Sequence, residues 1–358
     1  MVTEYITEAP RIFFSSLKHR ISPKKYSGTA DEICQQIVKD CWNGKYFQTS
    51  TSNFAQFWSR DFGWCTKSLL ELGYKEEVHK TLRYALNRFK QSGKITTTIT
   101  PMGKPFNFPC SAVDSLPWFI HSILISKFPY YDHRNFLNKE VQKFFDQFIN
   151  PQTGLVNPEL HVSSMKDYAI RKSSCYDNTM VALLARDLKI LKLHNPFEHF
   201  NYPDILKRHF WNGRYFYDDL SKQDYVAGDA NLFPFALGII NDTEMLQSAM
   251  NEIQNAGLDT PFPLKYTRSR QNVNFIWQEI FSRNYESNAI WMHMGPLYVK
   301  LLGQVDKEKT QQLISKYTEI IEHYKGFLEV FDKEGYPFKT PFYHSDRAML
   351  WAANYLTL

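Results

Sequence analysis

The sequence predicts an all-α protein built as an (α/α)6 barrel, a closed ring of six helical hairpins. Apolar residues recur at spacings of three and four along most of the 358-residue chain, whereas the alternating patterns typical of strands are scarce. Six similar helix openings also recur at a loose period of about 57 residues, which indicates stacked helical hairpins. Both observations favour one toroidal domain.

The periodic segments predict about twelve helices. They are expected near residues 29–43, 62–72, 76–91, 115–126, 134–149, 178–193, 203–210, 230–240, 243–256, 289–302, 306–325 and 346–357. We expect residues 1–28 to form an N-terminal extension that packs on the barrel. Residues 29–358 are expected to form the single barrel domain.

Every second helix begins in the same way, with an Asp or Asn that follows a polar or aromatic loop and precedes an apolar run. These residues are Asp61, Asp114, Asp177, Asp229, Asn288 and Asp346. Asp and Asn are favoured N-cap residues, so helix capping is the first interpretation of any single member. The loops before these helices are long and the return connections are short. A closed ring would therefore gather the long loops, which usually carry function, at one mouth.

Composition excludes several classes of protein. The net charge of +5 comes from dispersed Lys and Arg, which does not indicate nucleic-acid binding. The five cysteines form no CxxC pair, so neither a disulfide framework nor a zinc ribbon is expected. No signal-peptide pattern and no apolar run of membrane-spanning length is found. We expect a cytoplasmic protein without a cofactor, metal or membrane partner, and no pattern indicates an oligomeric state.

Several carboxyl groups could serve in hydrolysis of a glycosidic bond, which takes a general acid and a general base. Asp114 has small or apolar sequence neighbours and no adjacent cation, so desolvation would favour its protonated form and make it the candidate acid. If the guanidinium of Arg60 turns toward Asp61, the carboxylate of Asp61 stays charged, which suits binding of sugar hydroxyls. Glu329, in an apolar part of the last long loop, is the candidate base. The chemistry leaves four rivals: Glu279, Glu286, Asp332 and Glu334.

Aromatic side chains near the helix openings could stack on sugar rings, although those inside helices are equally consistent with core packing. They are Trp58, Trp118, Tyr176, Trp291 and Tyr343. Together with Arg60 and Asp61, the remaining candidates for substrate binding are polar residues at or near the openings: Asp177, Asp229, Asn231, Glu286, His293 and Asp346.

Several segments resemble, in the same order, the sequence blocks of the six-hairpin glycosidases. The blocks are 57–62, 112–120, 284–293, 329–331 and 343–346. The amylo-α-1,6-glucosidase (glycogen-debranching) group and the mannosylglycerate hydrolases look closest. The resemblance implies an (α/α)6 barrel and inverting hydrolysis of an α-linked glucoside or another small glycoside, without a metal. It makes Asp114 the acid and Glu329 the base. The chain departs at Met292-His293, where relatives commonly have Trp-Pro.

Two other functions fit the same ring. A sugar epimerase or polysaccharide lyase would use histidine or tyrosine as acid and base, and His293 and His344 lie near helix openings. A non-catalytic sugar-binding protein is the third hypothesis. A terpene cyclase is not indicated, because Asp218-Asp219 does not continue into an Asp-rich DDxxD motif.

Overall fold

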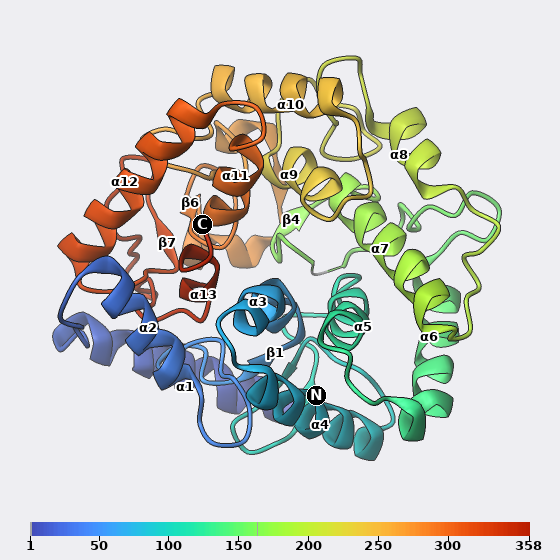
Figure 1. Cartoon of the computed structure of the whole chain (residues 1–358), viewed down its shortest axis with the longest axis horizontal. Helices are drawn as coiled ribbons and strands as arrows, with labels where there is room; N and C mark the ends of the chain where they lie inside the picture. The colour runs from blue at the N-terminus through green and yellow to red at the C-terminus, as the bar shows by residue number, and fades with distance from the viewer. Residues whose placement is uncertain (1, 163) are drawn as a thin grey trace.

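The computed structural model describes residues 2–162 and 164–358, and its helices form a ring of six antiparallel hairpins (Figure 1). The outer helices are α2 (Ala30–Cys41), α4 (Lys75–Ser92), α6 (Arg134–Phe148), α8 (Tyr202–Phe210), α10 (Thr243–Asn255) and α12 (Lys307–Tyr324). The inner helices are α3 (Ser59–Glu71), α5 (Ser115–Ser126), α7 (Cys175–Leu191), α9 (Gly228–Ala236), α11 (Gly295–Leu302) and α13 (Ala352–Tyr355). The predicted (α/α)6 barrel is therefore confirmed.

The inner helices contact one another in order around the ring, and α13 closes it by packing against α3. The chain thus brings its first and last hairpins together. The approach of α3 to α5 is close at Gly63, where an added Cβ would lie 2.6 Å from the side chain of Trp118. A side chain at position 63 would force these two inner helices apart.

Inner and outer helices differ in how much of their surface they bury. The outer helix α4 buries one stripe, from Val78 to Phe89, and exposes charged residues elsewhere. The inner helix α7 buries nearly every residue from Cys175 to Leu184. A helix that packs against neighbours on all sides needs apolar residues on all its faces. The inner helices are packed in this way, which explains their more apolar sequences.

Six long loops lie before the inner helices, and short antiparallel strand pairs tie several of them together. In chain order, the first to the sixth long loop are residues 42–58, 93–114, 149–174, 211–227, 256–294 and 325–351. Strand β1 (Phe57–Trp58) pairs with β2 (Thr98–Ile99), which also pairs with β3 (Pro105–Phe106). Strand β4 (Ala169–Ile170) pairs with β5 (Asn274–Phe275), and β6 (Ile290–Trp291) pairs with β7 (Val330–Phe331). Three 3-10 turns, η1 (Tyr131–His133), η2 (Arg270–Asn272) and η3 (Trp277–Ser282), complete the connections. The β1–β2, β4–β5 and β6–β7 pairs join loops of different hairpins, whereas the β2–β3 pair lies within one loop.

Two inner helices begin later than the sequence predicts. Helix α11 begins at Gly295 rather than near residue 289, because Ile290 and Trp291 are held extended by their pairing with β7. Helix α13 begins at Ala352 rather than near residue 346. Asn288 and Asp346 therefore do not open helices, and the predicted boundaries are wrong at these two points.

The capping interpretation is also wrong for the four openings that do lie at helix starts. The N-cap residues of α3, α7 and α9 are Trp58, Ser174 and Ala227, and the expected Asp falls inside the first turn. Asp114 does occupy the N-cap position of α5, but its side chain makes no capping bond. The carboxylates of Asp61, Asp114 and Asp229 instead contact other hairpins, whereas that of Asp177 accepts from Ser174 of its own helix start.

Helix α1 (Val2–Ile21) precedes the ring and contacts two of the long loops. Gln56 donates to Glu8 (2.6 Å) and Arg11 donates to the carbonyl of Asn53 (3.1 Å), both in the first long loop. The hydroxyl of Ser16 accepts from the backbone of His344 (2.6 Å) in the last one. Across the described residues, no helix has the length and apolar content needed to span a membrane.

Candidate active site

A pocket with about 490 Å³ of empty volume is lined by residues of α3 and of the first, third, fifth and sixth long loops. Seven of its residues were candidates from the sequence: Trp58, Arg60, Asp61, Glu286, Trp291, His293 and Glu329. Others were not singled out, among them Trp64, Asp167, Tyr266, Tyr285 and Trp351. The ring thus brings together carboxyl groups and aromatic rings that are far apart in the chain.

Glu329 lies in this pocket directly before β7, with its carboxyl group 1% exposed. The hydroxyls of Tyr285 and Tyr343 donate to its two oxygens, and the backbone N–H of Asp346 donates at 3.2 Å. Burial raises the pKa of Glu329 to about 7, although the two tyrosine hydrogen bonds oppose the shift. Three donors to one carboxyl group favour its ionised form.

Asp167, from the third long loop, also lines the pocket, with its side chain 23% exposed. Its carboxylate lies 3.7 Å from Nη2 of Arg60. The loop is held by Glu286, whose carboxylate accepts the backbone N–H groups of Asp167 (2.7 Å), Tyr168 (2.7 Å) and Ala169 (3.1 Å). Burial, together with the nearby charge of Asp167, raises the pKa of Glu286 to about 8. Glu286 therefore fixes the backbone that carries Asp167.

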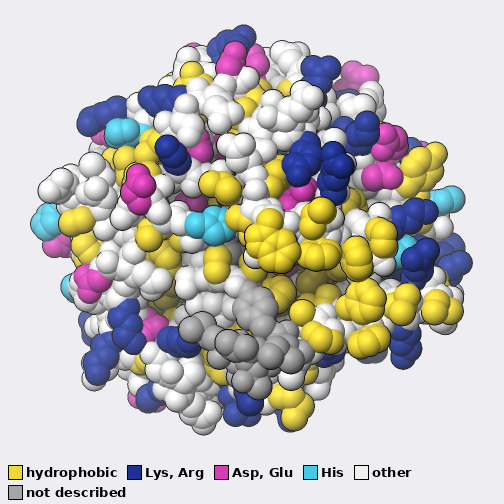
Figure 2. Space-filling model, turned by 180° about the vertical axis from the view of Figure 1, so that it is seen from behind, with side chains coloured by type: hydrophobic (Ala, Val, Ile, Leu, Met, Phe, Trp, Pro, Cys, Tyr) yellow, Lys and Arg dark blue, Asp and Glu magenta, His cyan; other side chains and the backbone are white. Residues whose placement is uncertain are grey.

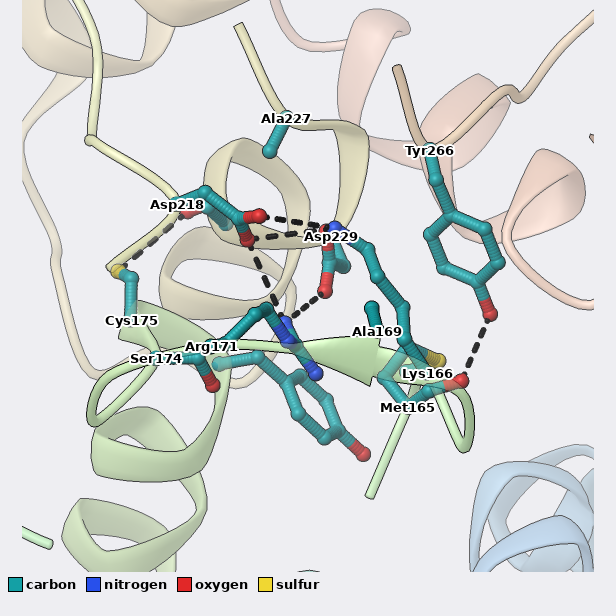
Figure 3. Close-up of polar contacts among 12 residues, drawn as sticks. Met165, Lys166, Ala169, Arg171, Ser174, Cys175, Asp218, Ala227, Asp229 and Tyr266 are labelled. Atoms are coloured by element: carbon teal, nitrogen blue, oxygen red, sulfur yellow. Dashed lines mark hydrogen bonds and ion pairs between the residues drawn. The ribbon is translucent and has the colours of Figure 1, made fainter. Parts of the chain in front are cut away.

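A buried ionic cluster anchors the same loop on both sides of Asp167 (Figure 3). The fully buried ammonium of Lys166 lies 3.1 Å from Asp218 and 3.3 Å from Asp229. The guanidinium of Arg171 lies 3.3 Å from Asp218 and 2.9 Å from Asp229. Burial alone would raise the pKa of Asp218, but the two cations outweigh it and the pKa is lowered. The charges of the two buried cations thus balance those of the two buried carboxylates.

Arg60 links Asp114, the acid expected from the sequence, to Asp167. Its Nη1 lies 3.3 Å from the carboxylate of Asp114 and its Nη2 faces Asp167. Asp114 is 1% exposed, also accepts from the hydroxyl of Tyr176 (3.1 Å), and is not among the residues that line the pocket. Burial raises its pKa to about 7, with Arg60 opposing. The expected direction of the shift is therefore found, but the expectation of no neighbouring cation is wrong.

Asp61 lines the pocket and accepts the indole N–H of Trp351 at 3.0 Å. Burial raises the pKa of Asp61 to about 6, although the charge of Arg60 lowers it. The guanidinium of Arg60 makes its ion pairs with Asp114 and Asp167 instead. The guanidinium of Arg60 is therefore not turned toward Asp61, which was the condition of the expectation, although its charge still lowers the pKa of Asp61.

The remaining substrate-binding candidates lie outside the pocket lining. Trp118 donates to Tyr176 in the inner wall, and Asp177 accepts from the hydroxyl of Ser174. Asn231 bonds to the backbone of Phe216, and Asp229 belongs to the ionic cluster. The hydroxyl of Tyr343 donates to Glu329, and Asp346 accepts from Ser50, Ser52 and the backbone of Asn53. These residues shape the walls behind the pocket.

The rivals for the base are placed apart from it, with one exception. Glu279 pairs with Arg270 (2.5 Å), and Asp332 accepts the backbone N–H groups of Glu334 and Tyr336. Glu334 is exposed. Only Glu286 shares the pocket with Glu329.

The two histidines of the alternative hypothesis are not brought together. His293 lines the pocket, where burial and the charge of Arg60 lower its pKa well below the usual value. His344 lies in a separate cavity beside α1. Within the described ranges, no group of three or more His, Cys, Asp and Glu side chains is arranged to hold a metal ion.

Asp167 had no local signal in the sequence beyond its position in a long loop. It lies between Lys166 and Tyr168, neither of which marks a helix opening. Its neighbours in the fold come from residues 60 and 286, in other hairpins. Only the closure of the ring makes it a pocket residue.

No protein-family model matches the chain, and no curated protein sequence matches it. Solved structures do match its fold. A rhamnosidase from Klebsiella oxytoca with rhamnose bound has a TM-score of 0.63 and 8% identity, over 93% of this chain and 65% of the rhamnosidase. A glycosidase variant in complex with glucose has a TM-score of 0.62 and 10% identity, over 98% and 96% of the two chains. A GH63 mannosylglycerate hydrolase from Thermus thermophilus, in complex with Tris and D-glycerate, has a TM-score of 0.60 and 10% identity, over 92% and 100%. The chain therefore has the fold of the six-hairpin glycosidases.

Proposed function

We propose that the protein is a glycoside hydrolase that cleaves a small glycoside with inversion, using Asp167 as general acid and Glu329 as general base. The observation that carries the proposal is that both carboxyl groups line one aromatic pocket at the mouth of the ring. A glycosidic bond is cleaved by such a pair, one group protonating the leaving oxygen and the other activating water.

The base role fits Glu329 because its partners donate hydrogen bonds. Tyr285, Tyr343 and the backbone of Asp346 all favour the carboxylate, and a carboxylate can accept a proton from water. Its pKa of about 7 makes this carboxylate a stronger base than an exposed glutamate. The water would be activated on the side of the sugar that faces the fifth and sixth loops.

The acid role fits Asp167 because it lines the pocket with its side chain partly exposed, where a leaving oxygen can reach it. The charge of Asp167 raises the pKa of both Asp114 and Glu286, because like charges repel. Asp114 was the acid expected from the sequence. Its carboxyl group lies behind Arg60 and outside the pocket lining, which suits orientation of Arg60 rather than contact with a leaving oxygen.

The walls of the pocket favour a small carbohydrate, such as an α-linked glucoside or a short oligosaccharide. Trp58, Trp291 and Trp351 offer ring faces for the C–H faces of a sugar. Rhamnose, glucose and glycerate occupy the solved structures that share the fold, so the panel of test substrates should include their glycosides.

The test is hydrolysis of a panel of 4-nitrophenyl α-glycosides and disaccharides, with Asp132→Asn, an exposed site, as the matched control. We expect Asp167→Asn and Glu329→Gln each to lower kcat about 10²- to 10⁴-fold. Proton NMR of the first product formed should show the inverted anomer. Full activity in either variant, or an isomerised product without hydrolysis, would contradict the proposal. Equal losses in Asp114→Asn and none in Asp167→Asn would return the acid role to Asp114.

We also propose that the protein acts in the cytoplasm. Cys34, Cys41, Cys65 and Cys175 are buried and form no disulfide, which suits a reducing compartment. The location of an epitope-tagged full chain in fractionated cells tests this.

A further inference from the structure

His293 occupies a defined place in the wall of the pocket. It lies between β6 and α11 and is 1% exposed. Its ring stacks face to face on the indole of Trp64, with the centroids 4.3 Å apart and the planes 3° from parallel. Trp64 comes from α3, so the stack crosses from the fifth hairpin to the first. The orientation of the imidazole is therefore fixed by packing.

The contacts of the imidazole identify which nitrogen carries the hydrogen. Nε2 lies 3.2 Å from the sulfur of Met165, and a thioether has no hydrogen to give, so Nε2 must be the donor. Nε2 also lies 3.4 Å from the hydroxyl of Tyr266, which gives its own hydrogen to the carbonyl of Met165 (3.1 Å). Because the pKa of His293 is lowered well below its usual value by burial and by Arg60, the ring is neutral. Nδ1 is then a bare acceptor.

Three nitrogens of this wall are buried without a hydrogen-bond partner among the described residues: Nδ1 of His293, Nε1 of Trp64 and Nε of Arg60. All three residues line the pocket. The first is an acceptor, whereas the indole and guanidinium N–H groups are donors. A buried polar group without a partner costs free energy, so a ligand that satisfies all three is favoured. Hydroxyl groups, which both donate and accept, meet this requirement.

We propose that His293 determines which sugar the pocket accepts, by taking the hydrogen of one substrate hydroxyl at Nδ1 while Trp64 and Arg60 donate to the sugar's oxygens. We therefore expect the substrate to be a neutral sugar and not an acid sugar. A carboxylate has no hydrogen for Nδ1, and Arg60, the one cation lining the pocket in the described chain, already pairs with Asp114 and Asp167. Ionised Asp61 and Glu329 line the same pocket and would repel an acid sugar. The inference rests on the proposed function only in taking the pocket as a sugar site.

Binding of free monosaccharides, measured by titration calorimetry on the full chain, tests the inference without requiring hydrolysis. The probes are glucose, mannose, galactose, rhamnose and glucuronic acid, followed by the monodeoxy and monodeoxyfluoro analogues of the tightest neutral ligand. We expect a neutral sugar to bind and glucuronic acid to bind at least about tenfold more weakly. At one ring position, the deoxy and the fluoro analogue should both lose about tenfold or more, because fluorine accepts a hydrogen bond but cannot donate one.

Variants of His293 assign that position. In His293→Phe, which keeps a ring against Trp64, the deoxy and fluoro analogues at that position should bind as tightly as the parent sugar. In His293→Asn, whose amide oxygen can lie near the position of Nδ1, the analogues should again bind more weakly than the parent sugar, though by a smaller factor. His199→Asn, an exposed histidine, is the matched control. Thermal unfolding of each variant separates misfolding from altered binding, and His293→Asn keeps the test open if His293→Phe does not fold.

Three results would overturn the inference: equal binding of glucuronic acid, an unchanged penalty in His293→Phe, or no binding of any neutral sugar at millimolar concentration. Loss of the proposed function has a different signature. In that case sugars bind with the expected pattern, but no glycoside in the panel is hydrolysed.

Discussion

The two proposed catalytic carboxyl groups are held by opposite kinds of chemistry. The loop that carries Asp167 is anchored by a buried ionic cluster of Lys166, Arg171, Asp218 and Asp229 (Figure 3). Glu329 is held by neutral donors, namely two tyrosine hydroxyls and one backbone N–H. The first arrangement stabilises a backbone segment, whereas the second contacts the carboxyl group itself.

This difference separates two kinds of sensitivity. Removing one member of the ionic cluster leaves a buried charge uncompensated, which affects the stability of the fold. Removing a tyrosine hydroxyl leaves the fold intact and changes the protonation of Glu329. Substitutions in the ionic cluster beside Asp167 should therefore first lower the stability of the fold. Substitutions of the tyrosines that bond to Glu329 should first shift the pH dependence of activity.

The largest effect is expected from Lys166→Met. This change leaves Asp218 and Asp229 with one cation between them, so we expect a loss of about 3 to 5 kcal/mol in the free energy of unfolding. Denaturant unfolding followed by circular dichroism measures it. The double variant Lys166→Met with Asp229→Asn restores the balance of charge and should recover much of the loss. Lys45→Met, at an exposed site, should change stability by no more than about 0.5 kcal/mol. A loss no larger in Lys166→Met than in Lys45→Met would contradict the role of the cluster.

A smaller effect, on activity, is expected from Tyr343→Phe or Tyr285→Phe. Each removes a hydrogen bond that lowers the pKa of Glu329, so that pKa should rise above about 7. The base acts when ionised, and the acid limb of kcat/KM should therefore move to higher pH. A hydrogen bond to a charged group contributes roughly 1.5 to 3 kcal/mol, so the rate at neutral pH should fall about tenfold or more.

The matched control for the tyrosine variants is Tyr202→Phe. Its hydroxyl donates to the carbonyl of Gly154 (3.0 Å), away from the pocket lining. The control should keep the pH profile of the unmodified protein. An unshifted limb in both Tyr285→Phe and Tyr343→Phe would show that Glu329 is not the titrating base.

The smallest effect concerns stability against pH. Burial raises the pKa of Asp61 to about 6, of Asp114 and Glu329 to about 7, and of Glu286 to about 8. The folded protein then binds more protons than the unfolded chain between about pH 4 and 8, so these groups make stability fall as pH rises. His293, whose pKa is lowered, acts in the opposite sense below about pH 6.5.

Thermal unfolding of Glu329→Gln and of the unmodified protein at pH 5.5 and pH 8 isolates the contribution of one group. The decrease in Tm from pH 5.5 to 8 should be smaller in the variant, by roughly a few degrees. A larger decrease in the variant would mean that the pKa of Glu329 is not raised by folding.

The ring could be predicted from sequence because its signals are local. The periodicity of apolar residues that predicts a helix lies within each segment. The alternation of long and short connections predicts at which end of the ring the long loops gather. Prediction failed where pairing across hairpins overrides local preference. Ile290 and Trp291 continue an apolar pattern, yet their pairing with Val330 and Phe331 holds them extended.

The site was only partly predictable for the same reason. Asp114 has no cation near it in the sequence, but Arg60, which is 54 residues away, reaches it in the fold. Asp167 was missed because everything that makes it a pocket residue comes from other hairpins. Glu329 was found through the resemblance of its block, and its tyrosine partners are 44 and 14 residues distant.

Hydrophobic side chains also gather on the face seen from behind in Figure 2. The chain also exposes Trp277 and Phe281 of η3, which contact each other, and Phe342 of the sixth loop, which contacts Phe281. Phe342 directly precedes Tyr343, which bonds to Glu329. The base side therefore adjoins an exposed apolar cluster, in contrast to the buried ionic cluster beside Asp167.

The closure of the ring has a consequence for the order in which the protein matures. The hydrogen bond from Trp351 to Asp61 joins the start of α13 to α3, and Glu329 reaches the pocket from the sixth hairpin. During synthesis the segments that hold Asp167 emerge well before these partners. The pocket is thus completed only when the final hairpin docks, so catalytic competence reports that the whole ring has assembled.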